Sequence, residues 1–576
     1  MVSDRRRWAL LAVLLAIVAT AGCGVSETRR PVDLGDAEVA GRTAGETRDP
    51  PSPTSAFTPS QLVVSYLQAA VGDPKEALNR VREFFVPKPD WEPSPAITVV
   101  RLIGDPSSTR QGSKTQVLVR MQTVGRLNAT GSFDPEGDAR PRTETFLVVD
   151  EGGRNQFRLE KAPVGLMISD TTLERFYAPS PVYFWNRDTE RPRLVPDLRY
   201  VPLTIALERR INQVVEWQLV GPSPWLEPAV LFQTGVKLKE AVVLRSNGPV
   251  VVNLSSAAVS DKPEELRRLA DQLRWTVRAH VSGPGVDLQI EGQKLAESIG
   301  DGYLAANPAA ETRDAALFDI DAESGKVVSR SGPKLPPRVL EAKANASVRY
   351  AGISADPYNV AAYVNQDDQL TVAKLGAPDA HVSDLPGPIG RPVWIPESND
   401  QFLVPAGGML HVINARRRAS PITPPGIGRV DAVSVSPDGR RVALAAGGRA
   451  YVGALEVGKG SVKVGSQLRE LVPGRMSVAA VAWASEARVL VAGWGISGKK
   501  AALFRATADG AIAIENSPEE AALTDVTAFP DRTGGPSGAS YIVARTADAV
   551  FYVFIRETEA GSTVTAAELN LPFYAG

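Results

Sequence analysis

The stretch that decides the fold of the C-terminal half is Val433-Ser-Val-Ser-Pro-Asp-Gly439, followed by Arg440-Arg-Val-Ala-Leu-Ala-Ala446 and Gly447-Gly448. It reads as a strand, a tight turn over its Ser-Pro-Asp-Gly sequence, a second strand and a second turn at the paired glycines. Turn residues that bracket two short apolar runs predict an antiparallel hairpin. A similar pattern of strand, turn and apolar run, built from different residues, occurs before and after this hairpin along the chain.

Five units of this kind follow one another, and corresponding residues in them are 41, 41, 48 and 46 positions apart. Those corresponding residues are Ile353, Trp394, Val435, Trp483 and Phe529. A period of about 40–45 residues with several strands per unit is typical of β-propeller blades, and the Ser-Pro-Asp-Gly turn is of the TolB and WD40-like kind. A sixth blade would combine Leu317–Asp321 with Thr563–Asn570 and close the ring. We therefore predict an all-β propeller of about six blades over residues 312–576, and the regular spacing disfavours the alternative, an open β-sandwich.

Residues 170–305 predict a second, α+β domain. An aromatic strand is followed by a helix that ends at Gly221, a hairpin formed by Glu240–Leu244 and Pro249–Leu254, a helix capped by Asp261, and an alternating strand at Val286–Ile290. The segment resembles the GerMN domain, first recognised in a spore-germination lipoprotein. The matching pieces are Tyr183-Phe-Trp185, Leu194-Val-Pro196, Leu219-Val-Gly-Pro222, Val251-Val-Asn-Leu-Ser255 and Gln272-Leu-Arg-Trp-Thr-Val277. The family usually has Asp where this chain has Asn253, so any role of that acid is absent here.

Residues 58–165 predict a smaller α+β domain. Thr58 is a helix N-cap with Pro59 at the first helical position, and a second short helix follows. Strand-like runs come next, at Ala96–Leu102, Gln116–Gln122, Glu144–Val149 and Gln156–Leu159. Two helices before an antiparallel sheet resemble the cone-shaped fold of the nuclear-transport-factor-like superfamily.

The chain begins like a bacterial lipoprotein precursor. Three arginines precede an apolar run from Trp8 to Val18, which is too short to span a bilayer, and small residues lead to Cys23, the single cysteine. This order resembles a lipobox, although Thr20 stands where Leu is usual. The resemblance implies a signal peptide over residues 1–22 and an S-diacylglycerol and N-acyl (palmitate) modification of Cys23. Residues 23–57, rich in Pro, Thr and charged residues, then form a disordered tether. The alternative is an uncleaved N-terminal anchor with an incidental cysteine.

Composition argues against several classes of function. The formal net charge is −1, and nucleic-acid binding requires a basic surface. The three histidines, His280, His381 and His411, lie far apart and in no metal-binding pattern. We therefore predict no metal, no cofactor and no catalytic residue.

Four local patterns have a functional and a structural interpretation, and we favour the structural one for three of them. Gly535–Ala539 approaches a nucleophile elbow, but reads as a blade loop. Asp319, Asp321 and Glu323 approach a calcium loop, but read as solvated acids at a strand end. Arg416–Arg418 reads as a solvated propeller loop. Trp225 lies in a predicted loop, so we expect it to be a contact residue.

The whole order of lipobox, small N-terminal domain, GerMN domain and propeller resembles the actinobacterial lipoprotein family LpqB. That resemblance implies an extracytoplasmic, lipid-anchored protein of the cell membrane. It also implies an accessory role, in which the protein contacts the sensor kinase of an MtrA–MtrB-type two-component system and affects envelope homeostasis and division. Two alternatives stay open: a module that binds peptidoglycan or glycan, and a propeller-based envelope hydrolase.

Overall fold

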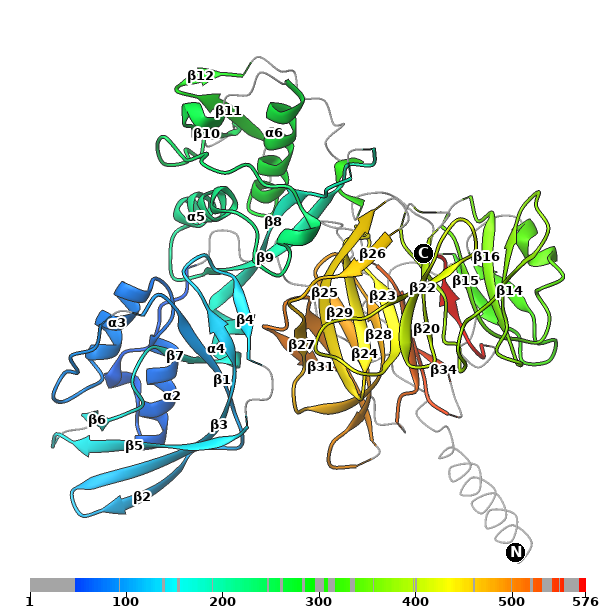
Figure 1. Cartoon of the computed structure of the whole chain (residues 1–576). Helices are drawn as coiled ribbons and strands as arrows, with labels where there is room; N and C mark the ends of the chain where they lie inside the picture. The colour runs from blue at the N-terminus through cyan, green and yellow to red at the C-terminus, as the bar shows by residue number, and fades with distance from the viewer. Residues whose placement is uncertain are drawn as a thin grey trace, which may run out of the picture.

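The computed structural model describes residues 47–576, with gaps at 93, 137–139, 153–155, 189, 246–247, 259–262, 282–284, 296–304, 309–315, 332–336, 356, 397, 399–400, 459–460, 499, 518–521, 531–540, 548–549 and 554–568. Cys23, the signal peptide and residues 23–46 of the predicted tether lie outside these residues. The prediction that the tether continues to residue 57 is wrong, because the Arg48 N–H donates to the Leu203 carbonyl and Ala56 is buried. Three parts are visible in Figure 1: an N-terminal domain in blue and cyan, a middle domain in green, and a propeller that continues to the red C-terminus. No helix in the described part of the chain is long and apolar enough to span a membrane.

The N-terminal domain is an α+β unit, as predicted. Its helices and strands are η1 (Pro53–Ser55), α2 (Pro59–Ala69), α3 (Pro74–Arg82), β1 (Ile97–Leu102), β2 (Ser107–Gln111), β3 (Lys114–Leu127), β4 (Phe133–Pro135), β5 (Arg142–Asp150), β6 (Phe157–Lys161) and β7 (Met167–Ser169). The sheet has the order β6-β5-β3-β1-β7. The Thr58 side chain accepts a hydrogen bond from the backbone N–H of Gln61, which confirms the predicted cap.

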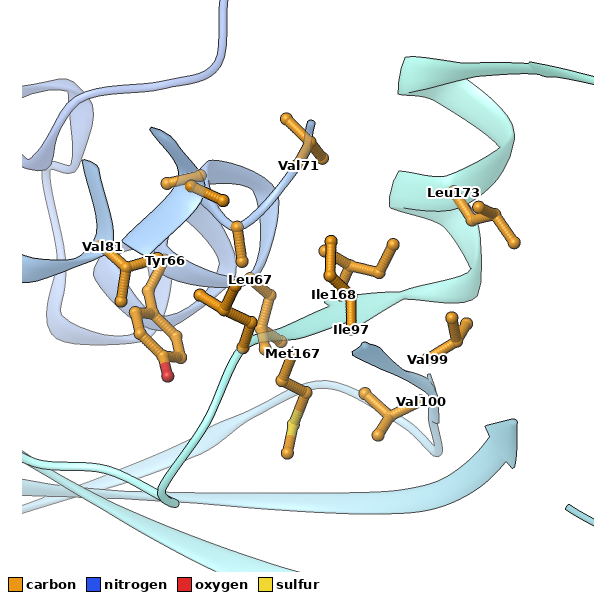
Figure 2. Packing of buried hydrophobic residues seen from close by; sticks show 14 of the residues in the cluster. Tyr66, Leu67, Val71, Val81, Ile97, Val99, Val100, Met167, Ile168 and Leu173 are labelled. Atoms are coloured by element: carbon orange, nitrogen blue, oxygen red, sulfur yellow. The ribbon is translucent and has the colours of Figure 1, made fainter. Parts of the chain in front are cut away.

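The core of the N-terminal domain lies where α2 packs against the sheet. Figure 2 shows Tyr66 and Leu67 of α2 beside residues of β1 and β7. Tyr66 makes edge-to-face contacts with Phe84, Phe85 and Phe146 at ring-centroid distances of 6.2, 5.7 and 6.0 Å. The ring is fully buried, and its hydroxyl has no hydrogen-bond partner.

The middle domain contains a long two-stranded ladder and a separate small sheet. Its elements are α4 (Asp170–Phe176), β8 (Tyr177–Trp185), β9 (Leu194–Pro202), α5 (Leu207–Val220), η2 (Glu227–Ala229), β10 (Val250–Leu254), η3 (Ser256–Ala258), α6 (Pro263–Arg278), β11 (Val286–Ile290) and β12 (Gln293–Lys294). Helix α5 ends at Gly221 as predicted, because that glycine has φ 125°. The predicted hairpin forms only in part: residues 240–244 are not a continuous strand, although Leu238 and Val243 make antiparallel bridges to Leu254 and Val251 of β10. The other edge of β10 pairs in parallel with β11. The predicted cap Asp261 lies outside the described residues.

The propeller has six sheets among the described residues. The first contains β13 (Leu317–Ile320), β14 (Val327–Ser331) and β35 (Phe573–Tyr574), and η6 (Arg338–Glu341) precedes the second. The second and third sheets contain β15 (Val348–Ile353), β16 (Val360–Asn365), β17 (Leu370–Lys374), β18 (Ala380–Val382), and then β19 (Val393–Trp394), β20 (Phe402–Ala406), β21 (Met409–Ile413) and β22 (Ala419–Ile422). The fourth contains β23 (Val430–Val435), β24 (Arg441–Ala446), β25 (Arg449–Gly458), β26 (Ser461–Val464) and β27 (Arg469–Leu471). The fifth and sixth contain β28 (Met476–Trp483), β29 (Arg488–Gly495), β30 (Ala501–Thr507), β31 (Ala513–Glu515), and then β32 (Asp525–Phe529), β33 (Tyr541–Arg545) and β34 (Val550–Val553).

The sequence repeat corresponds to the blades residue by residue. Each of the five aligned positions is the last residue of the first strand of its blade, in β15, β19, β23, β28 and β32. The ring closes where the C-terminal strand β35 pairs with β13 and lies beside β15 and β32. Residues 563–568 of the predicted closing segment lie outside the described residues, and among the described residues it is Phe573 and Tyr574 that pair with β13.

Candidate functional site

The middle domain docks on blades four and five of the propeller through an apolar interface. Val182 and Phe184 of β8 belong to the same buried cluster as Trp483 and Phe504 of the propeller. Trp225 is 3% exposed in this cluster, and the guanidinium of Arg469 lies 5.4 Å from its ring centroid. Trp225, which we expected to be a contact residue on a loop, is instead buried between the middle domain and the propeller of the same chain. Apolar burial of this kind holds domains together more firmly than a polar surface does.

A buried carboxylate sits in the same interface. Glu486, in the turn between β28 and β29, accepts hydrogen bonds from the Tyr183 hydroxyl at 2.8 Å and from the Asn307 amide at 3.1 Å. Burial raises the pKa of Glu486, and these two donors oppose that shift. The Arg441 guanidinium donates to the backbone carbonyl of Glu486 at 2.6 Å and stacks on Trp483 at 4.7 Å. The interface therefore depends on a polar cluster contributed by two domains and the segment that joins them.

A second buried carboxylate, that of Asp509 in the turn between β30 and β31, also accepts a hydrogen bond from a tyrosine of the middle domain. The Tyr200 hydroxyl of β9 donates to Asp509 at 2.9 Å and to the Thr507 hydroxyl at 3.2 Å. Burial raises the pKa of Asp509, whereas Arg469 lowers it. Tyr183 and Tyr200 come from paired strands, so the β8–β9 ladder contacts two turns of blade five, the β28–β29 turn and the β30–β31 turn.

The N-terminal domain contacts the same region. Arg469 forms an ion pair with Asp134 at 3.3 Å, and the propeller residues Ala511 and Ile512 complete the N-terminal core. Gly131 binds the middle domain closely: its carbonyl accepts from the Tyr200 N–H at 2.8 Å, and a Cβ there would lie 2.4 Å from the Trp217 ring. A side chain at this position would force the domains apart. Blades four and five thus carry both of the other domains.

A cavity of about 330 Å³ opens between the N-terminal domain and the propeller. Its walls are Gln122, Arg140, Pro141, Arg449, Glu470, Leu471, Val472, Pro473, Gly474, Met476 and Val478. Arg449 forms an ion pair with Glu470 along this wall. Val472 has φ 47°, a left-handed conformation that is rare for a β-branched side chain. Backbone strain of this kind gathers at functional sites, which makes this cavity the candidate binding site.

The cavity combines charged and apolar side chains. The described residues contain no group of three or more metal-ligating side chains. His411 is buried and His280 is half-buried, and desolvation lowers the pKa of each, that of His280 to about 4. Cationic Arg140, an ion pair and apolar side chains suit recognition of a partner with both acidic and apolar groups.

Asp319 and Asn253, both singled out from the sequence, make buried or structural contacts. Asp319 is fully buried, and its carboxylate accepts from the backbone N–H groups of Asn570 and Leu571 at 3.1 and 2.8 Å. The interpretation of Asp319 as a solvated acid was therefore wrong, because this acid holds the C-terminal segment against blade one. The Asn253 side chain donates a hydrogen bond to the Glu240 carboxylate and accepts one from the backbone N–H of Gly292, so its role is structural.

Other predicted positions are not part of the site. Cys23 and Gly535–Ala539 lie outside the described residues, and Arg416–Arg418 lies in the β21–β22 turn, away from the cavity. Sequence reasoning missed Glu486, Asp509 and the two tyrosines, because no local motif marks them.

Comparison with known proteins matches all three parts of the chain. The family described as "Lipoprotein LpqB, N-terminal domain" matches residues 52–174, "Sporulation and spore germination" matches 181–296, and "Lipoprotein LpqB beta-propeller domain" matches 326–550. Lipoprotein LpqB of Mycolicibacterium smegmatis is 27% identical over 78% of this chain and 80% of its own length. Lipoprotein LpqB of Thermobifida fusca is 26% identical over 66% of this chain and 62% of its own length. The WD40 β-propeller domain of Doa1 aligns with 42% of this chain and 75% of its own, at 12% identity and a TM-score of 0.31, a likeness too distant to inform function.

Proposed function

Because the chain belongs to the LpqB lipoprotein family, we propose that it is an extracytoplasmic accessory protein, anchored in the cell membrane through acylated Cys23. Its partner in this proposal is the extracytoplasmic domain of a sensor kinase of the MtrA–MtrB type. Binding would modulate the kinase and, through it, envelope homeostasis and division. The observation that carries the proposal is the strained, two-domain cavity beside Val472.

This cavity supports a binding role for two physical reasons. Clefts between domains are where binding sites usually form, because both walls contribute groups to one ligand. Arg140 is exposed on the rim, so it can meet an acidic residue of a partner without first breaking a buried contact. We expect the partner segment to lie across the cavity, with apolar groups against Leu471 and Met476.

A binding measurement with charge-reversal variants tests this proposal. The mature chain carrying Cys23→Ser, which removes the acylation site, is titrated with the kinase's extracytoplasmic domain. Arg140→Glu is expected to weaken binding by about tenfold, since reversing a charge at a rim replaces attraction by repulsion. Arg110→Glu is the matched control, because Arg110 is an exposed arginine of the same domain on β2, outside the cavity wall. Equal binding by both variants, or no binding by the parent chain, would contradict the proposal.

The wall-binding alternative predicts a different result. A peptidoglycan- or glycan-binding module would sediment with purified cell-wall material in the absence of the kinase domain. Sedimentation that is unchanged by Arg140→Glu, with no kinase binding by the parent chain, would favour that alternative.

A further inference from the structure

The hairpin that joins β29 to β30 carries an unusual combination of exposed side chains. Ile496 is 67% exposed and Trp494 is 36% exposed, and Lys500 beside them is also exposed. A Cβ placed on Gly495 or Gly498 would meet no atom within 4 Å, so the tip projects away from the rest of the structure. A large apolar residue that stays exposed on such a tip is costly in water unless something covers it.

The charge of this hairpin is one-sided. The tip residues 495–500 contain two lysines and no acidic residue, whereas the arginines Arg488 and Arg505 lie at the other end of the two strands. The two lysines, Lys499 and Lys500, follow directly after the Ile-Ser-Gly tip. Tryptophan and lysine are the side chains that favour the headgroup region of a bilayer, where an aromatic ring meets apolar chains and an ammonium group meets anionic lipid.

The length of the tether allows this hairpin to reach a membrane. If the chain is anchored at Cys23, residues 23–46 provide 24 residues before the described structure begins. Fully extended, they span at most about 80 Å, and as a flexible coil about 27 Å on average. The described chain then starts against the middle domain, where the Arg48 N–H donates to the Leu203 carbonyl at 2.9 Å. A tether of this reach keeps the propeller close to the bilayer and leaves its orientation to a second contact.

We propose that the tip of the β29–β30 hairpin, with Trp494, Ile496 and Lys500, inserts into the headgroup region of an anionic membrane and orients the propeller. The proposal rests on the lipid-anchored location proposed above. Trp494 and Ile496 bury their apolar atoms among the lipid chains, and Lys500 contacts lipid phosphates. The contact is an addition to the acyl anchor, because one short hairpin cannot hold a protein of this size on a membrane alone.

The single cysteine makes a direct test possible. The mature chain is coupled through the Cys23 thiol to vesicles that contain a maleimide lipid, which replaces the acyl anchor. Tryptophan fluorescence is then measured in phosphatidylglycerol vesicles with and without brominated acyl chains, which quench only a tryptophan that enters the lipid. We expect quenching in the parent chain and its loss in Trp494→Phe. Equal quenching in both chains, or none in the parent, would overturn the proposal.

Three further variants identify the chemistry. Ile496→Ser and Lys500→Glu are each expected to reduce the quenching at least twofold, and neutral phosphatidylcholine vesicles are expected to give less quenching than phosphatidylglycerol. Leu375→Ser is the matched control: Leu375 is 49% exposed, but it lies in the β17–β18 turn, on the opposite face of the propeller because strands alternate in direction. Loss of quenching in Leu375→Ser would count against a specific role of the hairpin.

Failure of this inference is distinguishable from failure of the proposed function. Binding of the kinase domain to the same variants is measured in solution without vesicles. Hairpin variants that lose kinase binding while the parent shows no quenching would assign the tip to a protein contact and overturn the membrane proposal. Normal quenching without kinase binding would leave the membrane contact standing and contradict only the proposed partner.

Discussion

Replacing Tyr183 by phenylalanine tests whether the buried carboxylate cluster holds the middle domain on the propeller. The substitution keeps the ring, which lies 5.7 Å from the Trp275 ring, and removes only the hydroxyl that donates to Glu486 at 2.8 Å. A hydrogen bond to a charged group contributes about 1.5–3 kcal/mol, and Glu486 would retain Asn307 as its other side-chain donor. We therefore expect the free energy of unfolding to fall by about 2 kcal/mol.

Tyr66→Phe is the matched control, because it removes a hydroxyl that is equally buried and has no partner. Removing an unsatisfied buried hydroxyl relieves a desolvation cost, so this variant is expected to be as stable as the parent or more stable. Both are measured by urea unfolding followed by tryptophan fluorescence and by limited proteolysis between the middle domain and the propeller. The reasoning is refuted if Tyr183→Phe unfolds at the urea concentration of the parent chain, or if both variants are destabilised equally.

Three other outcomes are expected. Burial raises the pKa of Glu486 above its ordinary 4.5, so over part of the pH range the folded state holds a proton that the unfolded state has released. The free energy of unfolding therefore falls as the pH rises from 4.5 through the folded-state pKa. In urea unfolding from pH 4.5 to 7.5, the free energy of unfolding of Glu486→Gln should fall less steeply with pH than that of the parent chain. An unchanged pH dependence in that variant would contradict the assignment to Glu486. Trp225→Ala leaves a cavity under Arg469 and is expected to lower the free energy of unfolding by about 3–5 kcal/mol. The variant should also be cleaved faster by protease at the junction of the middle domain and the propeller. Protection equal to that of the parent chain would show that this ring does not hold the interface. Cys23→Ser is expected to abolish acylation and to leave the signal peptide uncleaved, so that the chain runs as the larger, unacylated precursor. A fully processed, membrane-bound form of this variant would refute the lipid anchor.

The fold was largely predictable because its signals are local. A propeller blade requires a turn after each inner strand, and the Pro- and Asp-rich turns after Val435 and its equivalents announce each blade within a few residues. Helix α5 and its stop at Gly221 follow from apolar spacing and a glycine in the same way. The predicted strand at 240–244 forms only in part, because its pairing with β10 is reduced to two isolated bridges, at Leu238 and Val243, while the other edge of β10 pairs continuously with β11.

The candidate site was hidden from sequence reasoning because its residues come from distant parts of the chain. Glu486 sits in an ordinary polar turn, and its partner Tyr183 is 303 residues away. The cavity wall likewise joins Arg140 of one domain to Val472 of another. No motif records such a pair, since the spacing between its members has no local meaning.

The amino-acid sequence by itself determined the repeat, the class of each domain and the position of the lone cysteine, because strand alternation, turn chemistry and helix capping act over a few neighbouring residues. Tertiary structure alone decided which acids are buried, with Asp319, Glu486 and Asp509 inside and Asp321 in a solvent-facing turn. The physical reason is that burial and pKa depend on what packs against a side chain, and that is set by domain docking.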